Sequence, residues 1–588
     1  MRSVVFVIGL VFFLFWTGAM KVFGEELPAA VEETLAGTEG TGPGGPSMEG
    51  PLRGSEGTGF VAPSPAEVIF DVNGFQVEGN TILPLDQIET VLSSYRGTGK
   101  KLEEMENARL ALEGGYREAG YPAVLVIVPE QTLENGIVRL AVVESKVGLV
   151  RVTGNRYFTE DEILFNLPSL EHGAMLHEPS VLREMNAVNA NPDLEVAPVL
   201  HLGEEPGTVD LELKVEDRLP LHGSLEWNNR GTPNTPRQRL NGSIQYANLF
   251  HRDHSLSFQT TQTPEDFGGI QVYGLNYLVP LERDGHLLAL YGVWSKSQSV
   301  LDGASLPVVA GDIQVAGNAV VLGARYLFPL SGEEEKRFDQ LALGIDFRGM
   351  DKSEADFPGG LGTALISNRI QYTPVSVAYT GLRPDDGGIT KWNALFKGYA
   401  AGMVSKGGEE EFGGDPSDPA GTPGNRKGAS GTFGVVQAGM ERDQKLPGGG
   451  GLTLKGEGQW ATEPLISAEQ YYAGGVESVR GYQENEASGD RALRGSVEWT
   501  FPLKETITAE ALKGELMGVL FYDAAVLWTL DPFPGQDGQR QLEGAGFGLR
   551  GRFPHGVQLS VDQAWAMRNG VLTGRRDPEI YFSVKWLW

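Results

Sequence analysis

The chain has 588 residues and carries 77 acidic against 48 basic side chains, a formal net charge of −29. Domains usually contain about 100–200 residues, so several units are expected, and a polyanion without clustered Lys and Arg is excluded as a nucleic-acid binder. The lack of cysteine excludes disulfides, Cys-ligated zinc and cysteine nucleophiles. Only one run resembles a membrane helix, which excludes an α-helical transporter.

Residues 1–24 are predicted to be a signal peptide. Arg2 precedes an apolar run from Val4 to Trp16, which is shorter than the roughly 20 residues of a transmembrane helix. Small residues follow before Gly24, as in a cleavage zone. The alternative is an uncleaved anchor helix, and in either case the chain leaves the cytoplasm.

Residues 25–67 are predicted to hold a short N-terminal helix and a linker. Leu27–Ala36 has a helical pattern. Gly37–Pro65 consists largely of Gly, Pro, Ser and Glu with few large apolar residues. Such a segment cannot bury enough apolar surface to order itself, so we interpret it as a linker.

Two similar small units are predicted next, over residues 68–146 and 147–218. Gly79-Asn80 ends one alternating apolar run and Gly154-Asn155 ends another, and both residue types tolerate the positive φ of a turn. Two helix-like stretches and then two strand-like runs follow each turn. The helices are expected at Pro84–Tyr95, Leu102–Ala119, Thr159–Leu167 and Pro179–Asn189, and the strands at Val124–Val128, Ile137–Val143, Leu194–Leu200 and Val209–Val215. The order β-α-α-β-β therefore occurs twice.

Residues 219–588 are predicted to form a barrel. Apolar and polar residues alternate with period two in segments of about ten residues, and about sixteen such segments can be distinguished. The polar faces of these segments include His222, Glu226, Arg239, Asn241, Gln245, Arg494 and Glu498, which are interpreted as a wetted lumen wall.

The connections between these segments alternate in length. Short ones such as Phe250–Asp253 and Phe553–Gly556 are followed by long ones such as Ser295–Gly317, Val404–Gly431 and Ala461–Arg491. Short turns on one side and long loops on the other are typical of outer-membrane barrels, and a soluble sandwich gives no reason for them. The predicted fold class is thus α+β repeats followed by an all-β transmembrane barrel of about 16 antiparallel strands.

The last segment has the features of a barrel assembly signal. Its apolar residues alternate up to an aromatic C-terminus, and they are Phe582, Val584, Trp586 and Trp588. In outer-membrane barrels generally, a terminal strand of this kind is recognised by the barrel assembly machinery during biogenesis. Most such strands end in Phe, and Trp588 keeps the aromatic character.

The candidate functional residues lie in one long connection and one strand. The connection contains Val479, Arg480, Gly481 and Tyr482, and the strand presents Phe521, Asp523 and Ala525 to the lumen. A loop folded inward would place Arg480 against Asp523, because a guanidinium can hold a carboxylate through two bonds. The alternative is an exposed loop arginine and a hydrated wall aspartate that never meet.

These features resemble a known family. The repeated β-α-α-β-β order with its Gly-Asn turn looks like POTRA domains, which bind extended client chains at a sheet edge. Val-Arg-Gly-Tyr in the sixth outer loop and Phe-x-Asp-x-Gly on strand thirteen mark transporters and insertases built from POTRA domains and a barrel. The chain resembles TpsB-type two-partner secretion transporters, also called hemolysin secretion/activation proteins. The resemblance rests on the order of a signal peptide, a linker, two POTRA units and about sixteen strands. Ala525 stands where that family usually has Gly, which adds a methyl group at the wall.

The resemblance implies an outer-membrane transporter of a Gram-negative bacterium, with POTRA domains in the periplasm. These domains would catch a secreted TpsA-like exoprotein, an adhesin or a cytolysin, which would cross the barrel unfolded. Leu27–Ala36 would correspond to the helix that plugs the pore in relatives. The chain is expected to be a monomer surrounded by outer-membrane lipid, to bind no nucleic acid, cofactor or metal, and not to be an enzyme.

Two other functions share part of this pattern. One is an insertase that assembles other outer-membrane barrels, which carries the same loop motif but usually more POTRA units and no linker. The other is a passive or solute-selective porin, which sixteen strands allow. A porin has no use for periplasmic client-binding domains.

Overall fold

The computed structural model describes residues 69–588, without 234, 268–269, 282–284, 297–298, 302–312, 316–317, 331–336, 357–362, 415–423, 504–513 and 533–534. The described residues form two compact units, one ending at Leu219 and the other beginning at Pro220. The predicted signal peptide, N-terminal helix and linker lie outside the described residues. No helix in the described part of the chain is long and apolar enough to cross a membrane.

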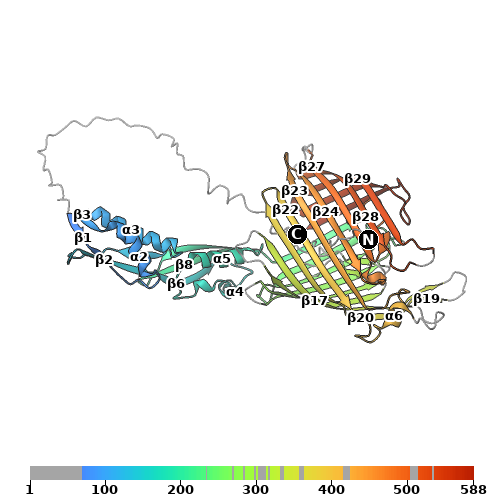
Figure 1. Cartoon of the computed structure of the whole chain (residues 1–588), viewed down its shortest axis with the longest axis horizontal. Coiled ribbons are helices and arrows are strands. Elements are labelled where there is room, and N and C mark those ends of the chain that lie inside the picture. Colours follow the sequence, from blue (N-terminus) through green and yellow to red (C-terminus); the bar gives the residue numbers. More distant parts are fainter. Residues whose placement is uncertain are drawn as a thin grey trace. The chain divides into compact units, whose positions relative to one another are not determined.

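The first unit contains two repeats of one topology (Figure 1). The first repeat consists of β1 (Ile69–Val72), β2 (Gly74–Glu78), α2 (Leu85–Leu92), β3 (Gly97–Lys101), α3 (Leu102–Glu118), β4 (Val124–Ile127) and β5 (Ile137–Glu144). The second consists of β6 (Lys146–Thr153), α4 (Glu160–Phe165), α5 (Glu178–Asn189), β7 (Leu194–Leu202) and β8 (Thr208–Asp217). In both, the last strand is central: β5 is parallel to β2 and antiparallel to β4, and β8 is parallel to β6 and antiparallel to β7. The β1–β3 pair is additional and was not predicted, because β3 reads Gly-Thr-Gly-Lys-Lys and carries no apolar pattern.

The Gly-Asn turn has the same cause in both repeats. Gly79 and Gly154 have φ of 84° and 93°, and a Cβ there would lie 2.3 and 2.4 Å from the carbonyl oxygens of Val142 and Val215. Only glycine combines this backbone conformation with so close an approach to the central strand.

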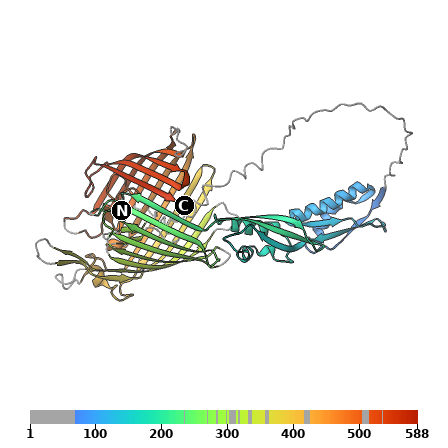
Figure 2. The same cartoon turned by 180° about the vertical axis from the view of Figure 1, so that it is seen from behind.

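The second unit is a closed antiparallel barrel of sixteen strands (Figure 2). The strands are β9 (Leu221–Asn228), β10 (Arg239–Leu249), β11 (His254–Gln262), β12 (Gln271–Pro280), β13 (Leu287–Lys296), β16 (Ala319–Pro329), β17 (Phe338–Met350), β20 (Ile370–Tyr372) with β21 (Val375–Asp385), β22 (Gly388–Tyr399), β23 (Phe433–Leu446), β24 (Gly450–Ala461), β27 (Arg491–Pro502), β28 (Glu515–Trp528), β29 (Gln539–Phe553), β30 (Val557–Ala566) and β31 (Pro578–Leu587). β20 and β21 occupy one strand position because both pair with β17. β31 pairs with β9 and closes the ring, so the predicted fold class is confirmed.

Side chains alternate between the two faces of the barrel wall. On β28, Leu520 and Tyr522 are exposed on the outer face, while Phe521 and Asp523 are buried on the inner face. A wall with an apolar exterior and no free edge satisfies every backbone group within a lipid bilayer. The inner face is therefore the place where polar side chains can hold another part of the chain.

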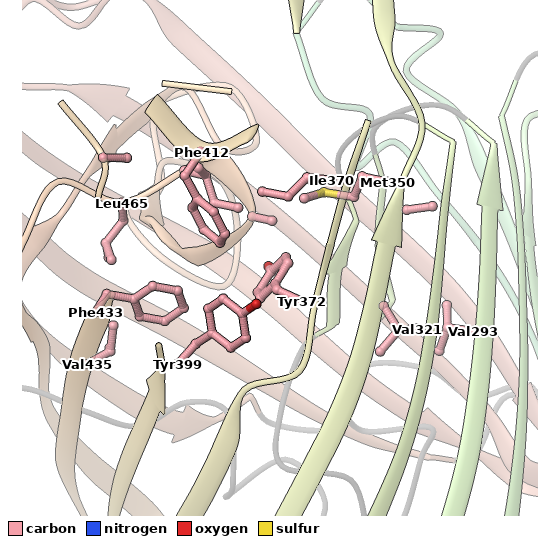
Figure 3. Close-up of a cluster of buried hydrophobic side chains, with 14 of the residues drawn as sticks. Val293, Val321, Met350, Ile370, Tyr372, Tyr399, Phe412, Phe433, Val435 and Leu465 are labelled. Carbon is pink, nitrogen blue, oxygen red and sulfur yellow. The ribbon is translucent and has the colours of Figure 1, made fainter. Parts of the chain in front are cut away.

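An aromatic cluster lies where the long connection between β22 and β23 begins and ends (Figure 3). Phe412, on the short helix α6 (Glu409–Gly413) of a long connection, packs on Tyr399 of β22 with ring centroids 5.8 Å apart. Tyr372 and Phe433 complete the contact, and Leu465 from the connection between β24 and β27 joins the same cluster. Burial of these rings fixes the long connections against the inner wall.

Candidate functional site

The connection between β24 and β27, residues 462–490, is called here the inner loop. Inward-facing side chains of β17, β28 and β31 bind it, namely Arg348, Asp523 and Tyr581. Strands so far apart around a ring can contact one segment only from inside. The inner loop therefore lies within the barrel, and its two short strands β25 (Tyr471–Ala473) and β26 (Ala487–Gly489) pair with each other.

Arg480 and Asp523 form a buried two-point ion pair. Arg480 Nε lies 2.7 Å from Asp523 Oδ2, and Nη2 lies 2.9 Å from Oδ1. The backbone N–H of Arg480 and the hydroxyl of Ser496 donate to the same carboxylate at 3.2 and 2.6 Å. Asp523 is 0% exposed and Arg480 5%. The structure thus brings together the two residues whose meeting the sequence left open.

Two further wall residues complete the surroundings of Arg480. Its Nη1 donates to Glu498 Oε2 at 2.7 Å, and its guanidinium lies 3.4 Å from the centroid of the Phe521 ring. Burial lowers the pKa of Arg480, but hydrogen bonds and charges from Asp523 and Glu498 outweigh it and hold the pKa above its ordinary value. The predicted wall residue Phe521 therefore contributes a cation–π contact.

Gly481 allows the loop backbone to touch the wall. Its φ is 102°, and a Cβ would lie 2.7 Å from the carbonyl carbon of Trp565 on β30. The N–H of Gly481 donates to the hydroxyl of Tyr581 at 2.9 Å, and that hydroxyl donates to the carbonyl of Tyr482. The sequence did not single out Tyr581, although its place on the inner face of the last strand was predictable.

Tyr482 and Val479 anchor the loop tip in the wall. The fully buried Tyr482 places its hydroxyl 3.0 Å from the carbonyl oxygens of Glu543 and Arg568. Val479 is equally buried, in an apolar cluster that includes Ala525. Because the Ala525 methyl packs in this cluster, it adds contact rather than displacing the loop.

The loop backbone approaches the wall closely at a glycine of β29, the strand next to β28, and not at position 525 of β28. A Cβ at Gly544 of β29 would lie 1.7 Å from the carbonyl oxygen of Arg480. Gly544 is paired with Asp523 across the two strands. The clearance that the tip requires thus comes from Gly544, which the sequence pattern did not reveal.

Glu469 holds the inner loop to the wall on other strands. Its carboxylate accepts hydrogen bonds from Tyr372 at 2.7 Å and from Arg348 at 2.9 Å, and it forms an ion pair with Lys397. These three groups lie on β20, β17 and β22. A single glutamate in a long loop is expected to be solvent-exposed, so the sequence gave no reason to predict that Glu469 binds the wall.

Two more acids tie the inner loop to neighbouring connections. Asp490 pairs with Arg426 and accepts the N–H of Leu530 at 2.7 Å. Glu486 accepts the N–H groups of Leu572 and Thr573 at 2.8 and 2.9 Å. Their partners lie in the connections before β23 and after β28 and β30, so the loop is bonded on several sides.

The predicted assembly-signal residues lie on the outer face of β31. Trp586 and Trp588 are half exposed, with ring centroids 4.8 Å apart, and Val584 shares their face. Phe582 packs edge-on against Trp227 of β9 at 4.9 Å. Their position fits the lipid face, and their role in assembly stays a prediction.

Three family profiles match the chain. The POTRA domain of ShlB type matches residues 70–145, the haemolysin secretion/activation protein ShlB/FhaC/HecB family matches 207–317, and the Omp85 superfamily domain matches 430–584. The predicted resemblance to the hemolysin secretion/activation proteins is thereby confirmed.

Individual relatives agree with these matches. The outer membrane transporter CdiB of Dickeya dadantii is 26% identical over 33% of this chain, and the chain spans only 36% of that relative's length. The heme/hemopexin transporter protein HuxB of Haemophilus influenzae is 21% identical over 74% of this chain and 72% of its own.

Solved structures share the fold. CdiB from Escherichia coli covers 90% of this chain and 93% of its own, with 17% identity and a TM-score of 0.58. BamA from Haemophilus ducreyi lacking POTRA domains 1–3 covers 88% and 100%, with 16% identity and a TM-score of 0.53.

Proposed function

We propose that this chain, which carries the domains of the hemolysin secretion/activation proteins, translocates an unfolded partner exoprotein across the outer membrane. Its POTRA repeats would bind the partner in the periplasm, and the partner would pass through the barrel to the cell surface. The observation that carries the proposal is the inner loop, held inside a POTRA-linked barrel by the Arg480–Asp523 pair.

The second repeat offers the edge that a client chain requires. In the second repeat the sheet order is β6-β8-β7, so the nine-residue β7 is an edge strand, and beyond Val196, which is bonded to Asn189, its Leu200 and Leu202 are exposed apolar side chains. The edge strand β4 of the first repeat is shorter, and the N–H and C=O of its Val126 are bonded to Glu113 and Arg109 of α3. An extended segment can add to the edge of β7 through main-chain hydrogen bonds, with alternate side chains meeting its apolar groups. This mode suits an unfolded client and requires no folded epitope.

The inner loop occupies space that a translocating chain needs. Many of its contacts with the wall are hydrogen bonds and ion pairs, which water in a wide lumen can replace once the loop moves. Export therefore requires displacement of the inner loop, and the Arg480–Asp523 pair would set how often that occurs.

The experiment is a comparison of the proteins released by the source bacterium with and without this chain. Loss of one large secreted or surface protein, with other barrels unchanged, is expected and identifies the client. A general fall in outer-membrane barrels would contradict secretion and support the insertase. No change in either would leave the porin, whose ion conductance should survive removal of residues 68–216.

A further inference from the structure

The seam between the first and last strands has the shortest ladder among the described barrel strands, with β20 and β21 counted as one strand. β31 and β9 pair over five residue positions, from Ser583 to Leu587, whereas other adjacent barrel strands pair over eight to fourteen. Backbone bonds between Gly223 and Trp588 extend the seam at one end. Fewer ladder bonds make this junction the one most easily parted.

A side chain continues the seam at its other end. Asn229, just beyond β9, donates from Nδ2 to the carbonyl of Ile580 at 2.7 Å and accepts the N–H of Phe582 through Oδ1 at 2.9 Å. The amide thus takes the place of a strand residue. The last strand is therefore held here by side chains rather than by a ladder, because Arg237 also bonds Glu579 and Trp227 packs on Phe582.

The tip of the inner loop contacts both sides of this weak junction. On the last strand, the buried Tyr581 hydroxyl accepts the N–H of Gly481 and donates to the carbonyl of Tyr482. On the other side, Arg230, next to Asn229, forms an ion pair with Glu477 at 3.0 Å. The ion pair is partly exposed and weak, so Tyr581 provides the stronger link.

We propose that the docked inner loop staples the barrel seam, through Tyr581 on one side and Arg230 on the other, so that undocking of the loop loosens the junction of β9 and β31. The two-sided contact couples the loop position to barrel closure. This coupling goes beyond the proposed function, because it holds whatever molecule the barrel passes.

Hydrogen exchange of the purified full-length protein tests the staple. Tyr581→Phe removes one hydroxyl from the seam side of the loop, and Tyr372→Phe is the matched control, since its hydroxyl binds Glu469 on the same loop away from the seam. We expect Tyr581→Phe to speed amide exchange in residues 580–587 by about tenfold, the effect of losing one to two buried hydrogen bonds. The control should change it less than twofold, and equal effects would overturn the proposal.

A second variant separates coupling through the loop from a local effect of Tyr581. Arg480→Ala undocks the loop without touching β9 or β31, so it alone should also speed exchange of the seam. In that background Tyr581→Phe should add less than twofold. An unchanged seam in Arg480→Ala, or a full tenfold addition, would show that the loop does not hold the seam. Heat-dependent migration on gels verifies that each variant retains its barrel.

Discussion

Replacement of Arg480 by alanine should release the inner loop while leaving the barrel intact. The change removes two bonds to Asp523 and one to Glu498, and it leaves both carboxylates without their cation in a largely buried site. Removing one partner of a buried pair costs about 3–5 kcal/mol. Since about 1.4 kcal/mol is a factor of ten, the undocked population should rise by at least about 100-fold.

A thiol placed in the loop measures this population. The chain has no cysteine, so Val479→Cys introduces a single label site, and Val479 is fully buried when the loop is docked. The rate of maleimide labelling then reports the undocked fraction. Arg480→Ala in this background should accelerate labelling by about 100-fold, and export of the client should fall at normal barrel levels.

Matched variants define the cause. Arg550→Ala removes a similar two-point pair, with Asp562 at 2.7 and 2.9 Å between two wall strands, and should change labelling less than twofold. Asp523→Ala added to Arg480→Ala should cost less than either change alone, because it removes the orphaned acid. Labelling that rises less than threefold in Arg480→Ala, or equally in Arg550→Ala, would refute the reasoning.

Three further predictions concern clearance, pH and the repeats. Gly544→Ala should undock the loop, because its Cβ would lie 1.7 Å from the carbonyl oxygen of Arg480, whereas Gly456→Ala, with open space around it, should not change thiol labelling. Burial raises the pKa of Glu484 to about 7, against the opposing charge of Arg230 and with support from acidic neighbours. The docked loop thus holds a proton that the free loop releases, so docking should weaken as pH rises from about 4.5 to about 7 and be level above. Glu484→Gln should remove this slope, and a ratio of labelling rates between the two proteins that stays constant with pH would contradict it. Gly154→Ala should lower the unfolding free energy of the second repeat by more than the about 1–2 kcal/mol of left-handed strain alone, because its Cβ would also meet the Val215 carbonyl. Gly173→Ala carries the strain without the clash, and equal denaturant midpoints for the two variants would count against the argument.

Local pattern was enough for the architecture. The strict alternation of β31, for example, distinguishes the outer Val584 and Trp586 from the inner Tyr581 and Ser583, and the burial of these residues follows it. The repeated Gly-Asn turn likewise predicted two units of one topology. Such a turn is visible in the sequence because a positive φ at one position favours glycine there. The strand β3, which has no apolar pattern, went unpredicted, as did short strands inside the long connections such as β25.

The candidate site was predictable in part. Arg480 and Asp523 were expected to meet if the loop folded inward, and a guanidinium with a wall carboxylate supplied the chemical reason. The sequence could not decide whether the loop did so. Nor could it show that Gly544, rather than position 525, provides the clearance, since that depends on which strand lies beside β28.

By itself, the sequence determined which face of its strand each residue occupies, the lipid side or the lumen side. It also determined where strands end in turns. Those choices follow from periodicity and backbone preference within about ten residues. Closure of the barrel decided the rest. It brought Glu469 to Arg348 and Lys397, and Gly481 to Tyr581. Such pairs join residues about 100 positions apart across a lumen, and no local pattern encodes which strands will face each other around a closed ring.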